Sequence, residues 1–320
     1  MGKQNTDMEK IKFSVLIPTF KDKYLKDCIN SILCQTYLNF EIIIVNDASP
    51  YDIDSIIDKY DDNRIHYFKN DIGFGAEDVV NNWNRCLSYA TGNYVICMGD
   101  DDMLLPNCLE IYNYHILSNP NIDIFHIRTE VINENGDLVN LQEARPTQES
   151  IYSLIWHKVN NKRIQYIGDF CFKNDALIKL GGFYYLPYAC FSDDISIYMA
   201  SLRKGIYNIN DIGFRYRISS QTITNTQNLR KTIISVEKAV EIMESYLSNP
   251  TNNIDDEKYR ILALKRLPQF KQEMRIYCIQ EDMKKAPLNS FRFWGNKYKQ
   301  YGLTVRTFYR IVWNSVKYKL

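Results

Sequence analysis

The sequence predicts an α/β fold in which a doubly wound, mostly parallel sheet is followed by a helical C-terminal extension. Two observations predict the sheet. Short runs made almost entirely of apolar residues alternate with segments whose apolar residues recur at helical spacing. Gly, Pro, Asn and Asp separate these segments, as expected of turns. From about residue 228 the pattern is helical and increasingly basic, which predicts the extension.

The first half of the chain shows the clearest alternation of strands and helices. The apolar run at 13–20 is stopped by Pro18, as a buried parallel strand would be. Further strands are predicted at 40–45, 65–69, 94–98 and 122–127. Helical spacing predicts helices between them, at 24–35, 53–60, 79–90 and 105–117.

After residue 130 the pattern loosens. A hairpin turn is predicted at 133–136, between strands at 124–132 and 138–141. A strand, a short helix and an amphipathic helix are predicted further on, at 167–172, 175–180 and 195–202. Gly181 and Gly182 end the short helix.

The composition is that of an ordinary globular protein, with 45% hydrophobic residues, 24% charged residues and a net charge of +1. The eight cysteines are scattered without a CxxC pair, which predicts free thiols in a reducing compartment. No two of the four histidines have metal-ligand spacing, which argues against zinc. The N-terminus lacks a signal-peptide pattern, and no run approaches the ~20 apolar residues of a membrane span. We therefore expect a cytoplasmic location.

Three consecutive acids, Asp100, Asp101 and Asp102, follow the strand predicted at 94–98. Ligands of parallel sheets bind at the carboxyl ends of the strands. Three adjacent carboxylates repel one another and need a cation or a hydrogen-bonded ligand, and their hard oxygen atoms suit Mg²⁺ or Mn²⁺ carrying a substrate's phosphates. The alternative is an acidic turn that caps the next helix.

Other strand ends are polar as well. Pro18, Thr19 and Asp47 follow buried strands and are predicted to line the same crevice, where Asp47 is either a hydrogen-bond acceptor for a base or ribose or a turn former. The pair Asp193 and Asp194 begins the helix at 195–202, as a helix cap or as a general base. The sequence contains no GxGxxG and no P-loop motif, which argues against dinucleotide and P-loop sites.

Together these segments resemble the inverting nucleotide-sugar glycosyltransferases of family 2, which have the Rossmann-like GT-A fold. The resemblance covers about residues 12–225, and no single motif in it is decisive, but their order and spacing are specific. The matching segments are VLIPTF at 15–20, IIVNDAS at 43–49, WN at 83–84, ATGNYV at 90–95, GDDDML at 99–104, LGGF at 180–183, DD at 193–194 and YR at 216–217.

The resemblance implies a role for individual residues. Asp194 would be the catalytic base, with Asp193 the alternative, and Mn²⁺ or Mg²⁺ would be held by Asp101 and Asp102, with the choice of ligand among the three acids left open. The implied nucleotide and donor contacts are Pro18, Thr19, Phe20, Asp47, Asn84, Arg85, Asp100 and Asp101. The implied acceptor contacts are Gly181, Gly182 and Phe183, and the implied diphosphate contacts are Arg217 and Ser219.

Three positions depart from the family pattern. Gly99 stands where the first acid of the DxD motif is usual. Trp83 stands where the family often has a diphosphate-binding Arg, so that Arg85 would replace it. Ser219 stands where many members have a His near the metal, and a hydroxyl is the poorer ligand.

By this resemblance the chain would transfer a sugar, from a UDP-sugar by preference, to a hydroxyl of a glycan or lipid-linked acceptor with inversion, in surface polysaccharide assembly. The alternatives are a nucleotide-sugar-binding protein without activity and a sugar nucleotidyltransferase. The predicted organisation is a polar tail (1–10), a catalytic domain (11–227) with a nucleotide-binding half (11–130) and an acceptor half (131–227), and the extension (228–320).

The end of the extension is unusually basic. Residues 284–320 contain nine Lys or Arg residues, interleaved aromatic residues and no Asp or Glu. Two interpretations stay open: a peripheral contact with the inner face of a membrane, with an apolar stripe of Val305, Tyr309, Ile311, Val312 and Val316, or a helical appendage packed on the catalytic domain. No nucleic-acid-binding motif accompanies the charge, so we expect no nucleic-acid partner.

Overall fold

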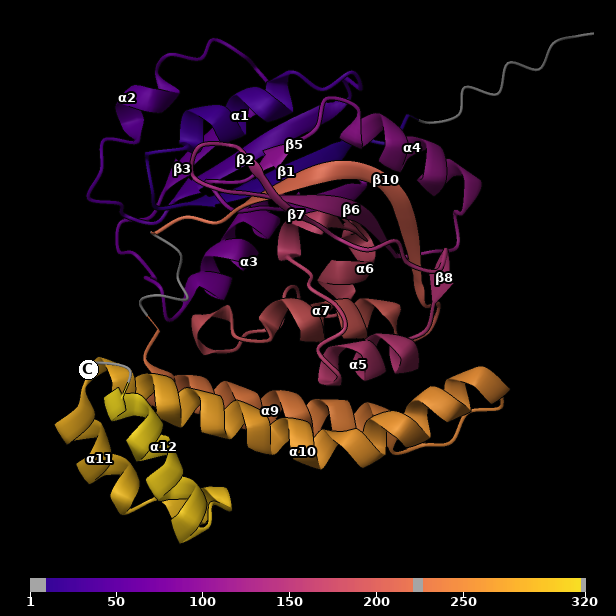
Figure 1. Ribbon diagram of the computed structural model, residues 1–320. Helices are drawn as coiled ribbons and strands as arrows, with labels where there is room; N and C mark the ends of the chain where they lie inside the picture. The colour runs from indigo at the N-terminus through magenta and orange to yellow at the C-terminus, as the bar shows by residue number, and fades with distance from the viewer. Residues whose placement is uncertain (1–9, 221–226, 318–320) are drawn as a thin grey trace, which may run out of the picture.

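The computed structural model describes residues 10–220 and 227–317, and the side chains as far as 315 (Figure 1). Almost all of the polar tail predicted for 1–10 therefore lies outside the described residues, as does the side chain of Val316. Within the described residues, no helix is long and apolar enough to cross a membrane.

A single central sheet organises the molecule. Along its main path the strands lie in the order β3 (Ile65–Lys69), β2 (Phe40–Asn46), β1 (Phe13–Thr19), β4 (Tyr94–Cys97), β9 (Phe170–Lys173), β6 (Ile124–Ile132), β10 (Ile206–Arg217) and β5 (Met103–Leu104). The first four strands are parallel, and so are β6 and β10. Antiparallel pairs join β9 to β4 and β6, and add β5, β7 (Leu138–Leu141) and β8 (Gln148–Glu149) to the second half. The predicted mostly parallel sheet is confirmed.

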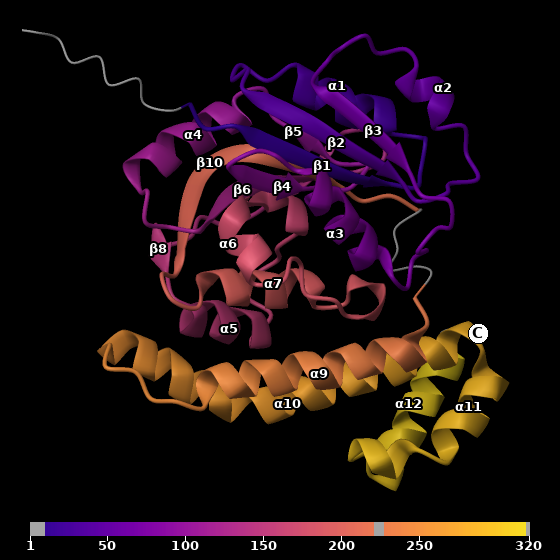
Figure 2. The ribbon, with the colours of Figure 1, turned by 180° about the vertical axis from the view of Figure 1, so that it is seen from behind.

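Helices cover both faces of this sheet, as Figures 1 and 2 show. One face packs against α1 (Leu25–Leu33) and α4 (Cys108–Ser118). The other packs against α3 (Val79–Tyr89), α5 (Ile151–Val159), α6 (Asn174–Lys179) and α7 (Ser192–Ser201). The short helix α2 (Asp54–Ile57) follows β2. Because neighbouring residues of a strand point to opposite faces, Leu16 enters one core and Val15 and Ile17 enter the other.

The C-terminal extension begins with two long helices, α9 (Leu229–Leu247) and α10 (Ile254–Lys285), which lie beneath α5 and α7 (Figure 1). Their apolar residues belong to the same core as those helices, and Phe270 packs edge-to-face on Phe191 with ring centroids 6.1 Å apart. The shorter helices α11 (Pro287–Gly295) and α12 (Val305–Lys317) follow at the end where α9 begins. The predicted helical C-terminal extension is therefore confirmed, and α9 and α10 pack on the helices beneath the sheet.

The structure differs from the prediction mainly in the second half. The helix α5 and the strand β10 were not predicted, and residues 167–169 form a 3₁₀ turn (η1) before β9 instead of part of a strand. Asn210 and Asp211 are residue types typical of turns, so the sequence did not indicate a continuous strand at β10. They lie where the pairing of β10 with β6 is interrupted. The predicted boundary at residue 130 falls inside β6, so the two predicted halves share one sheet.

Candidate functional site

The acid turn (Asp100, Asp101 and Asp102) follows β4 and is tied to two neighbouring strands by main-chain amides. Asp100 Oδ2 accepts hydrogen bonds from the amide nitrogens of Phe20, at 2.8 Å, and Lys21, at 2.7 Å, just beyond β1. Asp102 Oδ1 accepts one from the amide of Arg217 at the end of β10, at 2.9 Å. These two carboxylates therefore fix the turn between the strand ends.

Asp101 faces side chains instead of main-chain amides. The Lys21 ammonium lies 2.5 Å from Asp101 Oδ2 and 3.2 Å from Asp100 Oδ1, and the Ser219 hydroxyl donates to Asp101 Oδ2 at 3.1 Å. Burial raises the pKa of Asp100 and, well above its ordinary value, that of Asp102. Burial alone would lower the pKa of Lys21, but the charges of Asp100 and Asp101 outweigh it and raise that pKa. Lys21 therefore supplies a positive charge beside the acids. The sequence did not predict this role for Lys21.

Gly99 explains one departure from the family pattern. A Cβ atom at this position would lie 2.9 Å from both Asp101 Oδ1 and Asp102 Oδ2. Any side chain here would have to displace one of the two carboxylates. The absence of a side chain at position 99 therefore leaves room for the observed positions of the Asp101 and Asp102 carboxylates.

Arg217 binds the main chain of the acid turn. Its Nε donates to the carbonyl of Asp101 at 3.0 Å, its Nη1 donates to the carbonyl of Glu134 at 3.2 Å, and its guanidinium lies 4.3 Å from the centre of the Tyr24 ring. The side chain is buried. These contacts direct the guanidinium toward main-chain carbonyls, which favours a structural role over the predicted diphosphate contact.

Asp47 is enclosed by the loop that follows β3. Its Oδ1 accepts hydrogen bonds from Asn70 Nδ2 at 2.9 Å and from the Phe74 amide at 2.8 Å, and its Oδ2 accepts one from the Gly75 amide at 2.8 Å. The carboxylate therefore holds this loop in a defined conformation. Its contact with a nucleotide base stays a prediction.

The other predicted donor contacts gather at this edge of the sheet. Thr19 is fully buried and its carbonyl accepts the Asp47 amide, so it contributes main chain, and Pro18 lies beside it in β1. Phe20 is 43% exposed and packs edge-to-face on Tyr51, with centroids 6.4 Å apart. A groove of about 270 Å³ is lined by Lys69, Asn70, Asp71, Ile72, Phe74 and the exposed Arg85.

Asn84 and the Gly181–Phe183 segment bind each other. Asn84 Nδ2 donates to the Phe183 carbonyl at 2.9 Å, and the Phe183 amide donates to Asn84 Oδ1 at 2.8 Å. Gly182 has φ +86°, and a Cβ there would lie 2.4 Å from Asn84 Oδ1. The Phe183 ring is 2% exposed and packs edge-to-face on Trp83. Asn84 therefore clamps the turn and the Phe183 side chain faces the core, while the contacts of this segment with donor and acceptor stay predictions.

The acid pair, Asp193 and Asp194, lies in the first turn of α7. Phe191 is the cap residue of this helix, so neither acid caps it. Asp194 Oδ2 is 2.6 Å from Lys158 Nζ of α5, and its Oδ1 accepts a hydrogen bond from Gln165 Nε2 at 2.7 Å. Burial, and then the neighbouring charge of Asp194, raise the pKa of Asp193 to about 7.

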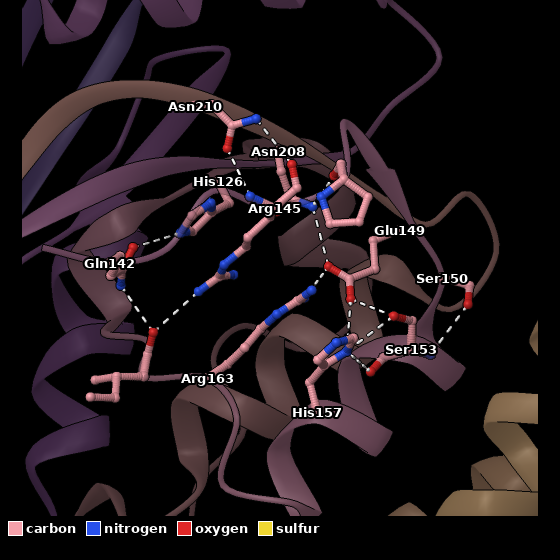
Figure 3. Close-up of polar contacts among 12 residues, drawn as sticks. His126, Gln142, Arg145, Glu149, Ser150, Ser153, His157, Arg163, Asn208 and Asn210 are labelled. Carbon is pink, nitrogen blue, oxygen red and sulfur yellow. Dashed lines mark hydrogen bonds and ion pairs between the residues drawn. The ribbon is translucent and has the colours of Figure 1, made fainter.

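A buried polar cluster supports the segment that carries Gln165 (Figure 3). The carbonyl of Ile164 accepts hydrogen bonds from Gln142 Nε2 at 3.0 Å and Arg145 Nη2 at 3.2 Å. Nearby, Glu149 pairs with Arg163. These contacts fix the main chain immediately before Gln165 and so help to position Asp194.

One tyrosine lies close to both groups of acids. The Tyr216 ring, on β10, stacks on Tyr166 with centroids 3.7 Å apart. Burial, and then the charges of Asp102, Asp101 and Asp193, raise the pKa of Tyr216. The charges of the acid turn and of the acid pair therefore act on the same residue, although the two groups are far apart in the sequence.

Comparison with known families is consistent with this site. The model of glycosyl transferase family 2 matches residues 14–183, more than half of the chain. The chain belongs to glycosyl transferase family 2. The family membership that the sequence motifs implied is confirmed, and it gives no support to the nucleotidyltransferase alternative.

Family 2 relatives match part of the chain. An uncharacterized glycosyltransferase of Methanocaldococcus jannaschii is 34% identical over 147 residues, which are 44% of this chain and 48% of that relative. The Escherichia coli UDP-Glc:α-D-GlcNAc-diphosphoundecaprenol β-1,3-glucosyltransferase WfgD is 28% identical over 130 residues, 40% of this chain and 50% of that protein. The matched region thus spans about half the length of these relatives.

The fold of the chain is also similar to that of solved structures. S. aureus TarS in complex with UDP-GlcNAc matches 91% of this chain and 92% of its own, with a TM-score of 0.58 and 17% identity. A TarS complex with UDP gives a TM-score of 0.53 at 18% identity. The predicted GT-A fold is confirmed by this likeness.

Proposed function

We propose that the chain is a metal-dependent, inverting glycosyltransferase that moves a sugar from a UDP-sugar donor to a hydroxyl of a glycan or lipid-linked acceptor in surface polysaccharide assembly. The observation that carries the proposal is that two groups of acids act on one residue, Tyr216. The charges of Asp102 and Asp101, in a carboxylate set suited to a metal–diphosphate, and of Asp193, a carboxyl group suited to accept a proton, all raise its pKa.

The residues present fit a divalent cation that arrives with its substrate. Within the described residues, no cluster of three or more His, Cys, Asp or Glu side chains is arranged to hold a metal. Mg²⁺ and similar ions are commonly bound by one or two carboxylates together with substrate phosphates. Asp101 and Ser219 would hold Mn²⁺ or Mg²⁺ in this way, whereas both Asp102 oxygens accept main-chain amides. When bound, the metal would stabilise the negative charge of the leaving diphosphate.

The nucleotide would lie along the edge formed by β1, β2 and the loop around Asp47. The exposed Phe20 ring offers a surface for a base, and the exposed Arg85 lies in the groove where it would contribute a positive charge. A UDP-sugar is supported by WfgD, whose name states a UDP-Glc donor, and by TarS, which was solved with UDP-GlcNAc. The WfgD name likewise supports a lipid-linked acceptor.

The acid pair of α7 would accept the proton of the acceptor hydroxyl. Asp194 is the first candidate, because Lys158 and Gln165 hold its carboxylate in one orientation. Asp193 is the second, because a pKa of about 7 suits a base at neutral pH. One displacement on the face opposite the leaving diphosphate inverts the anomeric carbon.

The first experiment measures donor binding and transfer with UDP-, GDP- and dTDP-sugars, with Mn²⁺ and with a chelator. We expect one nucleotide class to bind in a metal-dependent way and Asp101→Asn to lose that binding. Asp194→Asn should bind the donor normally but transfer the sugar about 10²–10⁴-fold more slowly. Donor binding by the wild type with no transfer to any acceptor tested would favour the alternative of a binding protein without activity. No binding of any nucleotide sugar would contradict both.

The proposal places the enzyme in the cytoplasm, in peripheral contact with an anionic membrane surface through α11 and α12. Val305, Tyr309 and Trp313, at intervals of four residues, are 52%, 61% and 70% exposed and form one stripe on α12. Ile311 is buried, so the stripe predicted from the sequence is wrong at that residue. Exposed basic side chains accompany the stripe at 292, 297, 299, 306 and 310. Apolar and basic groups together on neighbouring helices favour an anionic lipid surface.

Sedimentation with lipid vesicles tests this contact. The chain should bind vesicles that contain phosphatidylglycerol, and Tyr309→Ser with Trp313→Ser should weaken binding at least tenfold. Ile254→Ser is the matched control, because Ile254 is 73% exposed but lies at the opposite end of α10. Equal binding by all three proteins, or equal binding to uncharged vesicles, would contradict the contact.

A further inference from the structure

Lys21 lies where a metal ion would approach the acid turn. Its ammonium nitrogen is 2.5 Å from Asp101 Oδ2 and 3.2 Å from Asp100 Oδ1, and only 19% of its side chain is exposed. Its main-chain amide also donates to Asp100 Oδ2, at 2.7 Å. Both ends of this residue are therefore fixed on the acid turn.

Within the described part of the chain, no other side-chain cation lies within 4 Å of these carboxylates. Arg217 is close, but its Nε and Nη1 are directed to the carbonyls of Asp101 and Glu134. Adjacent buried carboxylates repel each other strongly unless a positive charge lies between them. Lys21 supplies that charge.

Lysine is suited to such a role because its charge is compact and its stem is flexible. An ammonium group and a divalent cation on the same carboxylate oxygen would repel each other at close range. The ammonium must therefore leave Asp101 Oδ2 when a metal binds there. Once released, it can pair with a phosphate of the donor.

We propose that Lys21 is a tethered cation that competes with the divalent metal for Asp101, so that the metal binds well only together with the nucleotide diphosphate. This inference rests on the proposed function, because it assumes that Asp101 is the metal ligand. Lys21 would thereby control when the metal binds. In the free enzyme Lys21 stays paired with the acids, and the metal and the nucleotide displace it when they bind together.

Mn²⁺ binding measured by electron paramagnetic resonance tests the competition without any activity assay. In the absence of nucleotide, Lys21→Met should bind Mn²⁺ at least tenfold more tightly than the wild type, because the competing charge is gone. Lys23→Met is the matched control. Lys23 is in the same loop and pairs with Glu134 at 2.8 Å, so its variant should bind Mn²⁺ as the wild type does. With UDP present, the wild type should bind Mn²⁺ tightly.

Thermal unfolding gives a second readout. Lys21→Met leaves Asp100 and Asp101 without their cation, so it should unfold at a lower temperature than the wild type, and Mn²⁺ should raise its unfolding temperature more than it raises that of the wild type. Lys21→Arg keeps the charge and should keep metal binding weak.

The two proposals fail in different ways. If the wild type binds no Mn²⁺ even with UDP, the proposed metal site is wrong, and the role of Lys21 is wrong with it. If the wild type binds Mn²⁺ with UDP but Lys21→Met has the same affinity for Mn²⁺ alone as the wild type, the metal site stands and the competition is overturned.

Discussion

The acid turn after β4 and the acid pair of α7 are both short runs of Asp, but the fold holds them by different means. Asp100 and Asp102 accept hydrogen bonds from main-chain amides at 2.7–3.2 Å. Asp194 is held by two side chains, Lys158 and Gln165. An amide is present whatever the residue, whereas a side-chain donor is lost with one substitution. We therefore expect the acid pair to be the more fragile of the two.

The two lysines sharpen this comparison. Lys21 occupies a position that a metal can take over, whereas Lys158, with 27% of its side chain exposed, pairs with the buried Asp194 at 2.6 Å and lies over the Phe191 ring at 5.2 Å. Burial alone would lower the pKa of Lys158, but the charges of Asp194 and Asp193 outweigh it and raise that pKa. Lys21, which a metal can replace, suits a site that binds the donor. Lys158, which stays paired with Asp194, suits a base that must keep one orientation.

The largest effect is expected from Lys158→Met. It leaves Asp194 buried without its ion pair, which typically costs about 3–5 kcal/mol of unfolding free energy when a buried pair is broken. Sugar transfer should fall as well, because the base loses its orientation. Urea denaturation with transfer kinetics measures both. Mn²⁺ should not restore this variant, in contrast to Lys21→Met.

Lys162→Met is the control for this prediction. Lys162 lies three residues after the end of α5, is exposed and stacks over the Trp156 ring at 4.4 Å. Its loss should change the unfolding free energy by less than about 0.5 kcal/mol. Equal losses in the two variants would show that Lys158 is only a surface charge and would break the comparison.

A smaller effect is expected from a third buried acid, Asp169, which is held by neutral donors. Its Oδ2 accepts hydrogen bonds from Gln142 Nε2 at 2.6 Å and Thr129 Oγ1 at 3.1 Å. Burial raises its pKa to about 7. Between about pH 4 and 7 the folded chain therefore keeps a proton on Asp169 that the unfolded chain has released. This group's contribution to stability is full below that window and is lost as the pH rises through it.

Asp169→Asn should remove up to about 1.4 kcal/mol per pH unit from the slope of unfolding free energy against pH in this window. Urea denaturation at pH 4, 5, 6 and 7 measures that slope. Asp193→Asn must be measured in parallel, because the pKa of Asp193 is also raised to about 7. A slope unchanged by Asp169→Asn would show that Asp169 is ionised in the folded chain.

The comparison also shows what the sequence could predict. The first four strands of the sheet and Asp101 follow from local patterns, because apolar runs and strand-end acids are visible in a few consecutive residues. Lys21, Lys158 and Gln165 belong to no such pattern, and their roles arise only from tertiary proximity. The clamp formed by Asn84 was not predicted for the same reason, since its partner Phe183 lies 99 residues further along the chain.

The smallest effect is expected at Ser219, which replaces the family's usual His. Its hydroxyl donates to Asp101 Oδ2 at 3.1 Å, and a hydrogen bond of this kind contributes about 0.5–1.5 kcal/mol. Ser219→Ala should therefore weaken metal-dependent UDP binding about 2- to 10-fold, measured by calorimetry with Mn²⁺. Ile218→Ala, at the exposed neighbour of Ser219, should leave binding unchanged. If Ser219→Ala also leaves it unchanged, Asp101 needs no side-chain donor to bind the metal, and the acid turn is even less dependent on side-chain donors than the acid pair.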